Sequence, residues 1–354
     1  MLTSTPFWTG RQGNGVPTNW ATCSRITAIA EFDLISRLQE IICIAPDRGV
    51  AECLVGIGDD GAVLDVPAHR DLVVCTDTLV EGVHFPSGTD SAAIGHKALA
   101  VNLSDLAAMG ADPAWFFMAL TLPFEDRRWL DSFAYGMAEM AGQARIVLAG
   151  GDVSSGPLSI TITAMGLVEK GEALVRSGAR NGDLVVVSGT PGAAAHALKK
   201  LQSAEVPHPL DRAALEFPAP RLELGGALVG LATACIDVSD GLMADLGHIL
   251  EQSCVGAEVQ LDKLPCPESL KGLDDEERWP LQLAGGDDYE LCFTMRQESA
   301  AELAEISRSC GVELTIIGTI NERQGLEFKT GKGELYDPGV NAYQHFQERG
   351  TQSH

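Results

Sequence analysis

The stretch Asn102-Leu103-Ser104-Asp105-Leu106-Ala107-Ala108-Met109-Gly110 ends a predicted helix around which the rest of the chain is arranged. The helix is expected to begin near Ser91, a common N-cap residue, and to end at Gly110. Asp105 lies within a stripe of apolar residues at helical spacing, namely Ile94, Ala98, Val101 and Ala108. A carboxylate in apolar surroundings must be neutralised, hydrogen-bonded or bound to a cation. Taken alone, Asp105 is best explained as a structural residue that caps a neighbouring turn.

The composition of the chain is that of a globular, strongly acidic protein. Its 354 residues are enough for two domains, and its 25 basic and 49 acidic side chains give a net charge of −24. This charge argues against a nucleic-acid-binding surface. No apolar run is long enough to predict a membrane helix. The nine cysteines form no C-x-x-C pair, which indicates reduced thiols and a cytoplasmic protein.

The pattern of apolar residues predicts a mixed α/β (α+β) fold with two domains. Residues 1–30 are expected to be a flexible extension without a signal peptide, residues 31–170 and 171–346 the two domains, and residues 347–354 a tail. In the first domain we predict helices at 31–42, 91–109 and 128–144, and strands at 63–66, 71–77, 116–122, 145–148 and 159–168. In the second we predict strands at 184–188, 257–261, 290–295 and 314–319, helices at 191–202, 211–216, 222–233 and 241–252, and a charged loop at 270–278.

The segment Gly56-Ile57-Gly58-Asp59-Asp60-Gly61 matches the G-x-G-x-x-G pattern of dinucleotide-binding proteins. That pattern requires a helix directly after it, whereas residues 62–66 alternate as a strand does. Two carboxylates would also repel a pyrophosphate unless a metal ion lay between them. We therefore reject dinucleotide binding, and a tight Asp-Gly turn or a metal ligand remains.

Four further acidic segments stand at predicted strand ends and turns: Thr76-Asp77, Gly150-Gly151-Asp152, Asp237-Val238-Ser239-Asp240 and Gly285-Gly286-Asp287-Asp288. Each one alone could be an Asx turn or an N-cap. Together they offer only hard oxygen ligands, which favour Mg²⁺, Mn²⁺ or Ca²⁺ and exclude a zinc site. Several such ions beside glycine-rich turns suit a polyphosphate. Because the chain has no P-loop, a nucleotide would be held through metal ions.

These segments, in this order, resemble the thiamine-monophosphate kinase family, over residues 31–346. The resemblance is carried by Gly56–Gly61, Thr76–Thr78, Gly82–Phe85, Asn102–Pro113, Gly150–Asp152, Arg176–Ala179, Asp237–Leu242 and Gly285–Leu291. It implies ATP-dependent phosphorylation of thiamine monophosphate to thiamine diphosphate. It also implies a two-domain fold with a C-terminal α/β sandwich, in a homodimer whose N-terminal mixed sheets pair across the two-fold axis.

The resemblance further implies a role for individual residues. Several Mg²⁺ ions would be bound by Asp60, Cys75, Thr76, Asp77, Asp105, Asp152, Asp237 and Asp240, with Cys75 contributing its backbone carbonyl. ATP, the co-substrate, would contact Tyr135, Gly151, Asp152, Arg176 and Ser239. Thiamine monophosphate would contact His84, Asp287 and Tyr343. The residues expected to act in catalysis are Asp105, Asp152 and Arg176.

One position departs from the family's pattern. Asp287 stands where the family commonly has glutamate, so the charge is kept but the side chain is one methylene shorter. The expected mechanism is direct in-line transfer, in which Mg²⁺ neutralises two anionic substrates and no covalent intermediate forms. Two alternatives stay open at this point. The protein could be another ATP-dependent enzyme of the same superfamily that uses a different acceptor, or a divalent-cation-binding protein without turnover.

Overall fold

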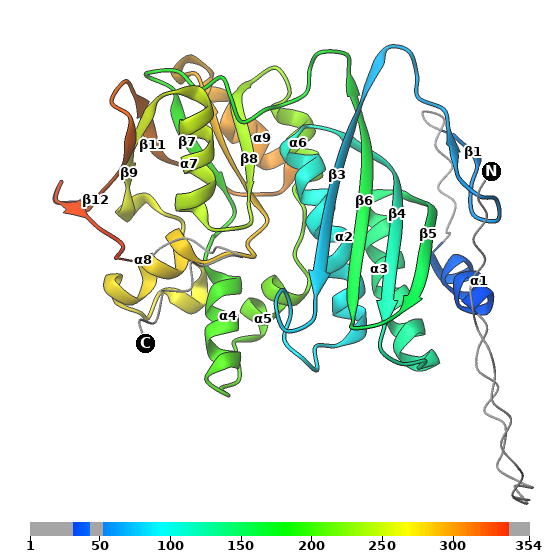
Figure 1. Cartoon of the computed structure of the whole chain (residues 1–354). Helices are drawn as coiled ribbons and strands as arrows, with labels where there is room; N and C mark the ends of the chain where they lie inside the picture. Colours follow the sequence, from blue (N-terminus) through cyan, green and yellow to red (C-terminus); the bar gives the residue numbers. More distant parts are fainter. Residues whose placement is uncertain (1–30, 43–51, 340–354) are drawn as a thin grey trace, which may run out of the picture.

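The structure of the protein is a computed structural model that describes residues 31–42 and 52–339 (Figure 1). The first half contains α1 (Glu31–Ile42), β1 (Cys53–Val55), β2 (Val63–Leu64), β3 (Arg70–Val80), α2 (Ser91–Ala108), β4 (Asp112–Leu122), α3 (Arg127–Ala144), β5 (Val147–Ser155) and β6 (Ser159–Glu169). The second half contains β7 (Leu184–Ser188), α4 (Ala193–Gln202), α5 (Pro209–Glu216), α6 (Leu222–Leu228), β8 (Ala232–Val238), α7 (Leu242–Ser253), β9 (Gly256–Gln260), α8 (Asp275–Ala284), β10 (Glu290–Met295), α9 (Leu303–Cys310), β11 (Leu314–Asn321), β12 (Gly325–Lys329) and β13 (Leu335–Tyr336). These elements confirm the predicted mixed α/β fold.

A four-stranded sheet with strand order β3-β6-β4-β5 organises the first half. Strand β6 is antiparallel to β3 and β4, whereas β4 and β5 are parallel. Helices α2 and α3 lie behind this sheet in Figure 1, and Phe116, Ile160 and Ile162 are buried on that side. The opposite face is called the open face below. Successive residues of a strand point to opposite faces, and from Leu72 to Thr78 every second residue of β3 is exposed on the open face.

Helix α2 is the hub of the molecule. All of its residues are buried except Ala92 and Asp105, so the prediction of a single apolar stripe is wrong. The helix approaches α3 so closely that a Cβ on Gly136 would lie 1.9 Å from the carbonyl oxygen of Ala92. Its N-cap is Asp90 rather than Ser91, and its end is confirmed by Gly110, whose φ of 68° suits glycine.

The second half is built on a seven-stranded sheet with order β13-β12-β9-β11-β7-β10-β8. Helices α7 and α8 pack on one face through residues such as Leu246 and Leu283, and α6 and α9 pack on the other through Leu228 and Ile306. This arrangement confirms the predicted C-terminal α/β sandwich. Within the described ranges, no helix has the length and apolar character needed to cross a bilayer.

Two segments of the second half differ from the prediction. The helix expected at 222–233 ends at Leu228, and Gly230, with a φ of 78°, leads into the strand β8. The charged loop expected at 270–278 contains the start of α8, whose N-cap is Asp274. The acidic residues that follow Asp274 lie in the first turn, where they are favoured by the helix dipole.

Candidate active site

The last turns of α2 bring two distant strands together beside Asp105. The side-chain oxygen of Asn102 accepts a hydrogen bond from the amide of Asp77 on β3 at 3.2 Å. The hydroxyl of Ser104 donates to Oδ2 of Asp237, at the end of β8, at 2.8 Å. Asp105 follows directly, at one of the two positions of α2 that are not buried. The helix therefore places three carboxylates around one opening.

Burial disfavours ionisation of all three carboxylates, and neighbouring carboxylates add to this effect at Asp105 and Asp237. Burial, together with the neighbouring carboxylates of Asp237 and Asp77, raises the pKa of Asp105 to about 8. Burial raises the pKa of Asp237 to about 6, against the opposing effect of the hydrogen bond from Ser104. Burial also raises the pKa of Asp77. The cluster thus holds more negative charge than its surroundings stabilise, which is the condition under which a cation binds.

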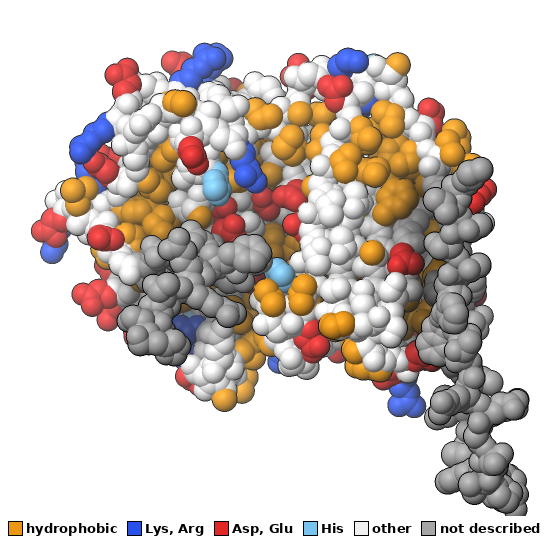
Figure 2. Space-filling view, in the orientation of Figure 1, with side chains coloured by type: hydrophobic (Ala, Val, Ile, Leu, Met, Phe, Trp, Pro, Cys, Tyr) orange, Lys and Arg blue, Asp and Glu red, His pale blue; other side chains and the backbone are white. Residues whose placement is uncertain are grey.

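The cluster lines a cavity of about 660 Å³, called the acidic cavity here. The predicted site residues on its wall are Thr76, Asp77, His84, Asp105, Asp237, Ser239, Asp240 and Asp287. Figure 2 shows acidic side chains gathered at the junction between the four-stranded sheet and the second half of the chain. The cavity therefore lies where α2 meets both halves, and most predicted metal and substrate ligands share it.

Arg176 and the turn after β8 also contribute to the acidic cavity. Arg176 is exposed, and its charge lowers the pKa of both Asp105 and Asp237. The turn that carries Ser239 and Asp240 is fixed by Asp245 of α7, whose carboxylate accepts both backbone amides at 3.0 Å. The guanidinium thus favours the ionised form of both Asp105 and Asp237.

His84 and Asp287 occupy two turns on the wall of the acidic cavity. Nδ1 of His84 accepts a hydrogen bond from the amide of Val80 at 3.0 Å, which places the proton of a neutral imidazole on Nε2. The carboxylate of Asp287 is paired with the ammonium of Lys97 at 2.9 Å. The hydroxyl of Tyr289 donates to the same carboxylate at 3.0 Å. Both side chains are therefore held in a single orientation.

A second cavity, of about 670 Å³, contains the remaining glycine-rich segments and is called the glycine-rich cavity here. Asp60 reaches it from the loop between β1 and β2, and Gly151 and Asp152 from β5. We expected the Gly150-Gly151-Asp152 segment to form a turn after a strand. This prediction is wrong, because the segment lies inside β5. The loop that carries Asp60 joins two antiparallel strands, which confirms that it is not a dinucleotide-binding turn.

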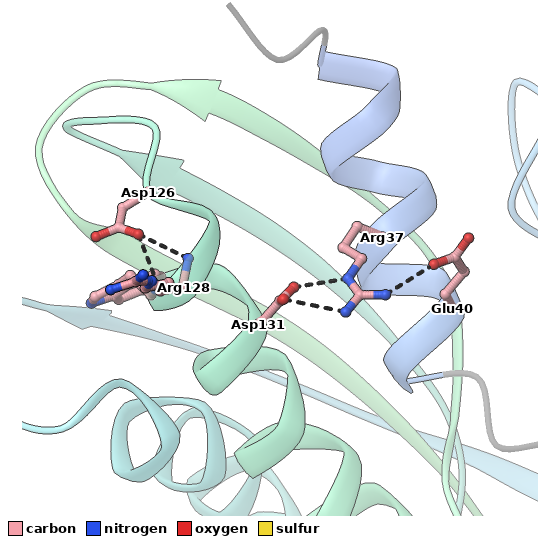
Figure 3. A network of polar contacts seen from close by, with 6 residues as sticks. Arg37, Glu40, Asp126, Arg128 and Asp131 are labelled. Carbon is pink, nitrogen blue, oxygen red and sulfur yellow. Dashed lines mark hydrogen bonds and ion pairs between the residues drawn. The ribbon is translucent and has the colours of Figure 1, made fainter. Parts of the chain in front are cut away.

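Helix α1 forms one wall of the glycine-rich cavity through Leu38 and Gln39. It is tied to α3 by a two-pronged ion pair, in which Nε and Nη2 of Arg37 donate to the two carboxylate oxygens of Asp131 at 2.8 and 3.2 Å (Figure 3). Asp126 lies nearby as the N-cap of α3 and accepts from the amide of Arg128 (Figure 3). These contacts position the wall independently of any ligand.

The two cavities are separated by the width of the sheet. Asp77 on β3 pairs with Ile162 on β6, Ile162 with Met118 on β4, and Met118 with Gly151 on β5. Three strand spacings of about 4.8 Å put Asp77 and Gly151 about 14 Å apart. Two oxygen ligands of one Mg²⁺ ion are at most about 4 Å apart. Asp152 of one chain therefore cannot share an ion with Asp77 of the same chain.

The other predicted site residues take varied positions. Tyr135 is exposed on α3, and its side chain is near Arg37. The hydroxyl of Thr76 contacts Thr163 at 3.0 Å on the open face, on the opposite side of β3 from Asp77. The thiol of Cys75 lies 3.3 Å from the carbonyl of Asn102, and burial raises its pKa. Tyr343 lies outside the described residues.

The donor set of the acidic cavity fits Mg²⁺ in the manner usual for phosphate-bound ions. In the described part of the chain, no three acidic, imidazole or thiol side chains converge closely enough to enclose an ion. Mg²⁺ is generally bound by one or two carboxylates, with water and substrate phosphates completing the octahedron. The hard oxygen ligands and the unbalanced charge of Asp105 and Asp237 suit this kind of binding.

Sequence reasoning nominated Asp105 but missed the residues that support the site. Asn102 and Ser104 lie in the same stretch and hold Asp77 and Asp237. Lys97 interrupts an apolar run of α2, a signal that could have identified it as a buried, paired charge. The partners of these side chains lie far away in sequence, so only the fold reveals them.

The chain is similar to known proteins over most of its length. The model of the AIR synthase related protein N-terminal domain matches residues 58–168, and that of the C-terminal domain matches residues 170–331. Thiamine-monophosphate kinase of Haemophilus influenzae is 43% identical over 303 residues, which are 84% of this chain and 91% of that protein. The kinase of Escherichia coli K12 is 42% identical over 326 residues, 90% of this chain and 99% of its own.

Solved structures give the same result. Thiamine-monophosphate kinase from Stenotrophomonas maltophilia K279a superposes with a TM-score of 0.79 at 44% identity and covers 87% of this chain and 98% of its own. A structure described as AaThiL complexed with AMPPCP and TMP has a TM-score of 0.70 at 28% identity, covering 92% of this chain and 100% of its own. By sequence and by fold, the chain belongs to the thiamine-monophosphate kinase family.

Proposed function

We propose that the protein uses ATP to phosphorylate thiamine monophosphate, forming thiamine diphosphate and ADP. The observation that carries this proposal is the cluster of Asp77, Asp105 and Asp237 around one opening of the acidic cavity. It occurs in a chain that is 42% identical, over most of its length, to a named kinase for this substrate. The relative in complex with an ATP analogue and TMP supports the same pair of substrates.

Mg²⁺ is the proposed cofactor. Asp77, Asp105 and Asp237 would hold it in the acidic cavity, and Asp60 and Asp152 would do so in the glycine-rich cavity. When bound, it would neutralise the phosphates and align the attacking and leaving oxygens. The rigid attachment of Asp105 to α2, and the hydrogen bond from Ser104 to Asp237, keep these ligands in place. Asp240, Thr76 and the carbonyl of Cys75 remain proposed ligands of the same kind.

The proposed reaction requires neither a general base nor a nucleophilic side chain from the protein. The acceptor phosphate is already ionised, so no strong general base is required, and no side chain is proposed as a nucleophile. Arg176 is proposed to stabilise the charge that develops on the transferred phosphoryl group, because its guanidinium acts on the same carboxylate cluster. The backbone of Gly151, Ser239 and the exposed Tyr135 are proposed to bind ATP. His84, Asp287 and Tyr343 are proposed to bind thiamine monophosphate.

A homodimer is proposed because the open face of the four-stranded sheet is suited to burial by a second copy. Leu72 and Val74 are 41% and 52% exposed on this face, and Thr76 and Thr78 extend it along β3. Figure 2 shows hydrophobic side chains gathered on the upper part of the sheet. Two sheets packed face to face lie about 10 Å apart. A two-fold axis parallel to the strands would set β3 of one chain opposite β5 of its partner.

This dimer would bring together two cavities that lie far apart within one chain. The acidic cavity at the β3 edge of one chain would meet the glycine-rich cavity at the β5 edge of the other. Mixing the variants Asp77→Asn and Asp152→Asn, each expected to be inactive alone, tests the arrangement, because a mixed dimer would contain one site with neither substitution. Recovery of about a quarter of parental activity after subunit exchange is expected, from random pairing of two variants. If mixed dimers are shown to form and the activity does not recover, a site shared between the two chains is contradicted.

The proposed acceptor is tested by steady-state turnover of the full chain with ATP and Mg²⁺. We expect thiamine monophosphate to give thiamine diphosphate, and aminoimidazole ribonucleotide precursors or selenide to give no ADP release above background. A preference for another acceptor would identify a different enzyme of the superfamily. A cytoplasmic location is also proposed, since the seven cysteines within the described residues are free thiols.

A further inference from the structure

Lys97 is a buried positive charge on α2, among neighbours that are mostly apolar. The residue is 3% exposed. Its ammonium lies 2.9 Å from Oδ1 of Asp287 and 3.4 Å from the carbonyl oxygen of His84. A buried ammonium must be paired and hydrogen-bonded, because its desolvation is costly. Lys97 therefore joins two turns that are far apart in sequence and that both line the acidic cavity.

The turn that carries Asp287 depends on such support. Asp287 and Tyr289 have φ values of 67° and 51°, a left-handed conformation that is uncommon for residues other than glycine. The backbone amide of Asp287 donates to the carbonyl of Ser239, in the turn after β8, at 2.9 Å, and that of Tyr289 donates to the carbonyl of Val238, the last residue of β8, at 2.8 Å. Strained backbone persists only where its surroundings hold it. The direction of the Asp287 carboxylate is thus set by its neighbours and not by its own backbone preference.

The contacts of Asp287 are concentrated on one oxygen. Lys97 and the hydroxyl of Tyr289 both donate to Oδ1, at 2.9 and 3.0 Å. Oδ2 accepts no side-chain or backbone hydrogen bond from the described residues. The side chain is 27% exposed and lies on the wall of the acidic cavity. The pair is electrically neutral as a whole, and it offers a ligand one oriented acceptor oxygen.

We propose that Lys97 is a positioning residue that orients Asp287 toward the heterocyclic part of the acceptor substrate. This inference rests on the proposed function. The phosphate of the acceptor is drawn to the metal ions that the carboxylate cluster would hold, so Asp287 meets the heterocyclic part, which carries a cationic ring and an amino group. Because Lys97 already cancels the charge of Asp287, recognition depends on where Oδ2 points. The carboxylate of Asp287 lies within hydrogen-bonding reach of Lys97, at 2.9 Å.

The test compares Lys97→Met with the parent in steady-state kinetics of the full chain. Methionine keeps the apolar stem and removes the ammonium. We expect the KM for thiamine monophosphate to rise about tenfold or more, the usual size for losing an oriented, charged hydrogen-bonding partner. The KM for ATP should stay within about twofold, since Lys97 contacts neither the carboxylate cluster nor the glycine-rich cavity. The matched control is Lys200→Met, which removes an ion pair to Glu205 on the surface of α4 and should leave both constants unchanged.

A double variant separates positioning from simple charge compensation. Lys97→Met leaves Asp287 unpaired, so its melting temperature should fall, and Lys97→Met/Asp287→Asn should restore the melting temperature because no unpaired charge remains. The KM for thiamine monophosphate should stay high in the double variant, since the oriented carboxylate is absent. The inference is overturned if the double variant recovers the parental KM, or if Lys97→Met lowers the melting temperature and leaves that KM unchanged. Failure of the parent to use thiamine monophosphate would instead contradict the proposed function.

Discussion

Replacing Asp105 with asparagine should stabilise the metal-free protein and abolish its activity. Burial and the carboxylates of Asp237 and Asp77 raise the pKa of Asp105 from 3.8 to about 8. An acid whose folded-state pKa lies above its unfolded value binds more protons when folded. The free energy of unfolding is therefore not reduced by Asp105 below about pH 4, and it falls progressively as the pH rises from there toward about 8. The asparagine variant has no ionisable group at this position and should lack this loss.

The size of the effect follows from the pKa. One pH unit corresponds to about 1.4 kcal/mol, so at pH 7, which lies between 3.8 and about 8, the raised pKa of Asp105 lowers the free energy of unfolding by up to about 4 kcal/mol. Asp105 is partly exposed, and Asp77 and Asp237 share the repulsion, so the gain on substitution should be nearer about 2 kcal/mol. Loss of a proposed metal ligand at the reacting phosphates should reduce kcat by about a thousandfold or more.

The assay is urea unfolding at about pH 6 and pH 8.5, first without divalent cations and then with Mg²⁺. The parent should lose stability between the two pH values and regain it with Mg²⁺, whereas Asp105→Asn should respond weakly to both. Asp65→Asn, an exposed residue outside both cavities, is the matched control and should behave as the parent does. An Asp105→Asn variant that is no more stable than the parent at pH 8.5, or that keeps near-parental turnover at saturating Mg²⁺, would contradict the prediction.

Two further substitutions test the support of the site and the packing of the hub. Ser104→Ala removes the hydrogen bond to Asp237 and should weaken activation by Mg²⁺ by about tenfold to a hundredfold in a metal titration of turnover; an unchanged titration would contradict this role. Gly136→Ala places a Cβ 1.9 Å from the carbonyl oxygen of Ala92 and should lower the free energy of unfolding by about 3 kcal/mol. Gly247→Ala on α7, where a Cβ meets nothing within 4 Å, should instead stabilise by up to about 1 kcal/mol in the same urea assay, and equal effects would rule out the close helix approach.

The sequence predicts the fold well where the local signal and the tertiary environment agree. The strand at Leu184–Ser188 and the helix ending at Gly110 were predicted closely, because a continuous apolar run and a C-terminal glycine have few alternatives. Ala232 and Thr233 were predicted as the end of a helix, because the residues before them, from Leu222 to Leu231, are rich in leucine. The structure makes them part of β8, since pairing with β10 completes the edge of the sheet. Pairing between distant strands is not visible in a local window.

The candidate site was predictable in its residue types but not in its arrangement. Aspartates beside glycine-rich segments predict oxygen ligands for a divalent cation, and most of these aspartates share the acidic cavity. The strand order β3-β6-β4-β5 then places Asp152 at the far edge of the sheet from Asp77, a separation that depends on topology alone. The contact between Lys97 and Asp287 was likewise hidden, because it joins α2 to a turn in the other half of the chain.

The most direct test of the account is the fate of the γ-phosphate. The full chain is incubated with Mg²⁺, thiamine monophosphate and ATP labelled at the γ-phosphate, and the products are separated. We expect label in thiamine diphosphate, in equal amount to the ADP formed and with none on the protein, because Asp105 and its neighbours support direct transfer. Label in inorganic phosphate or on the protein, with thiamine monophosphate unchanged, would contradict it.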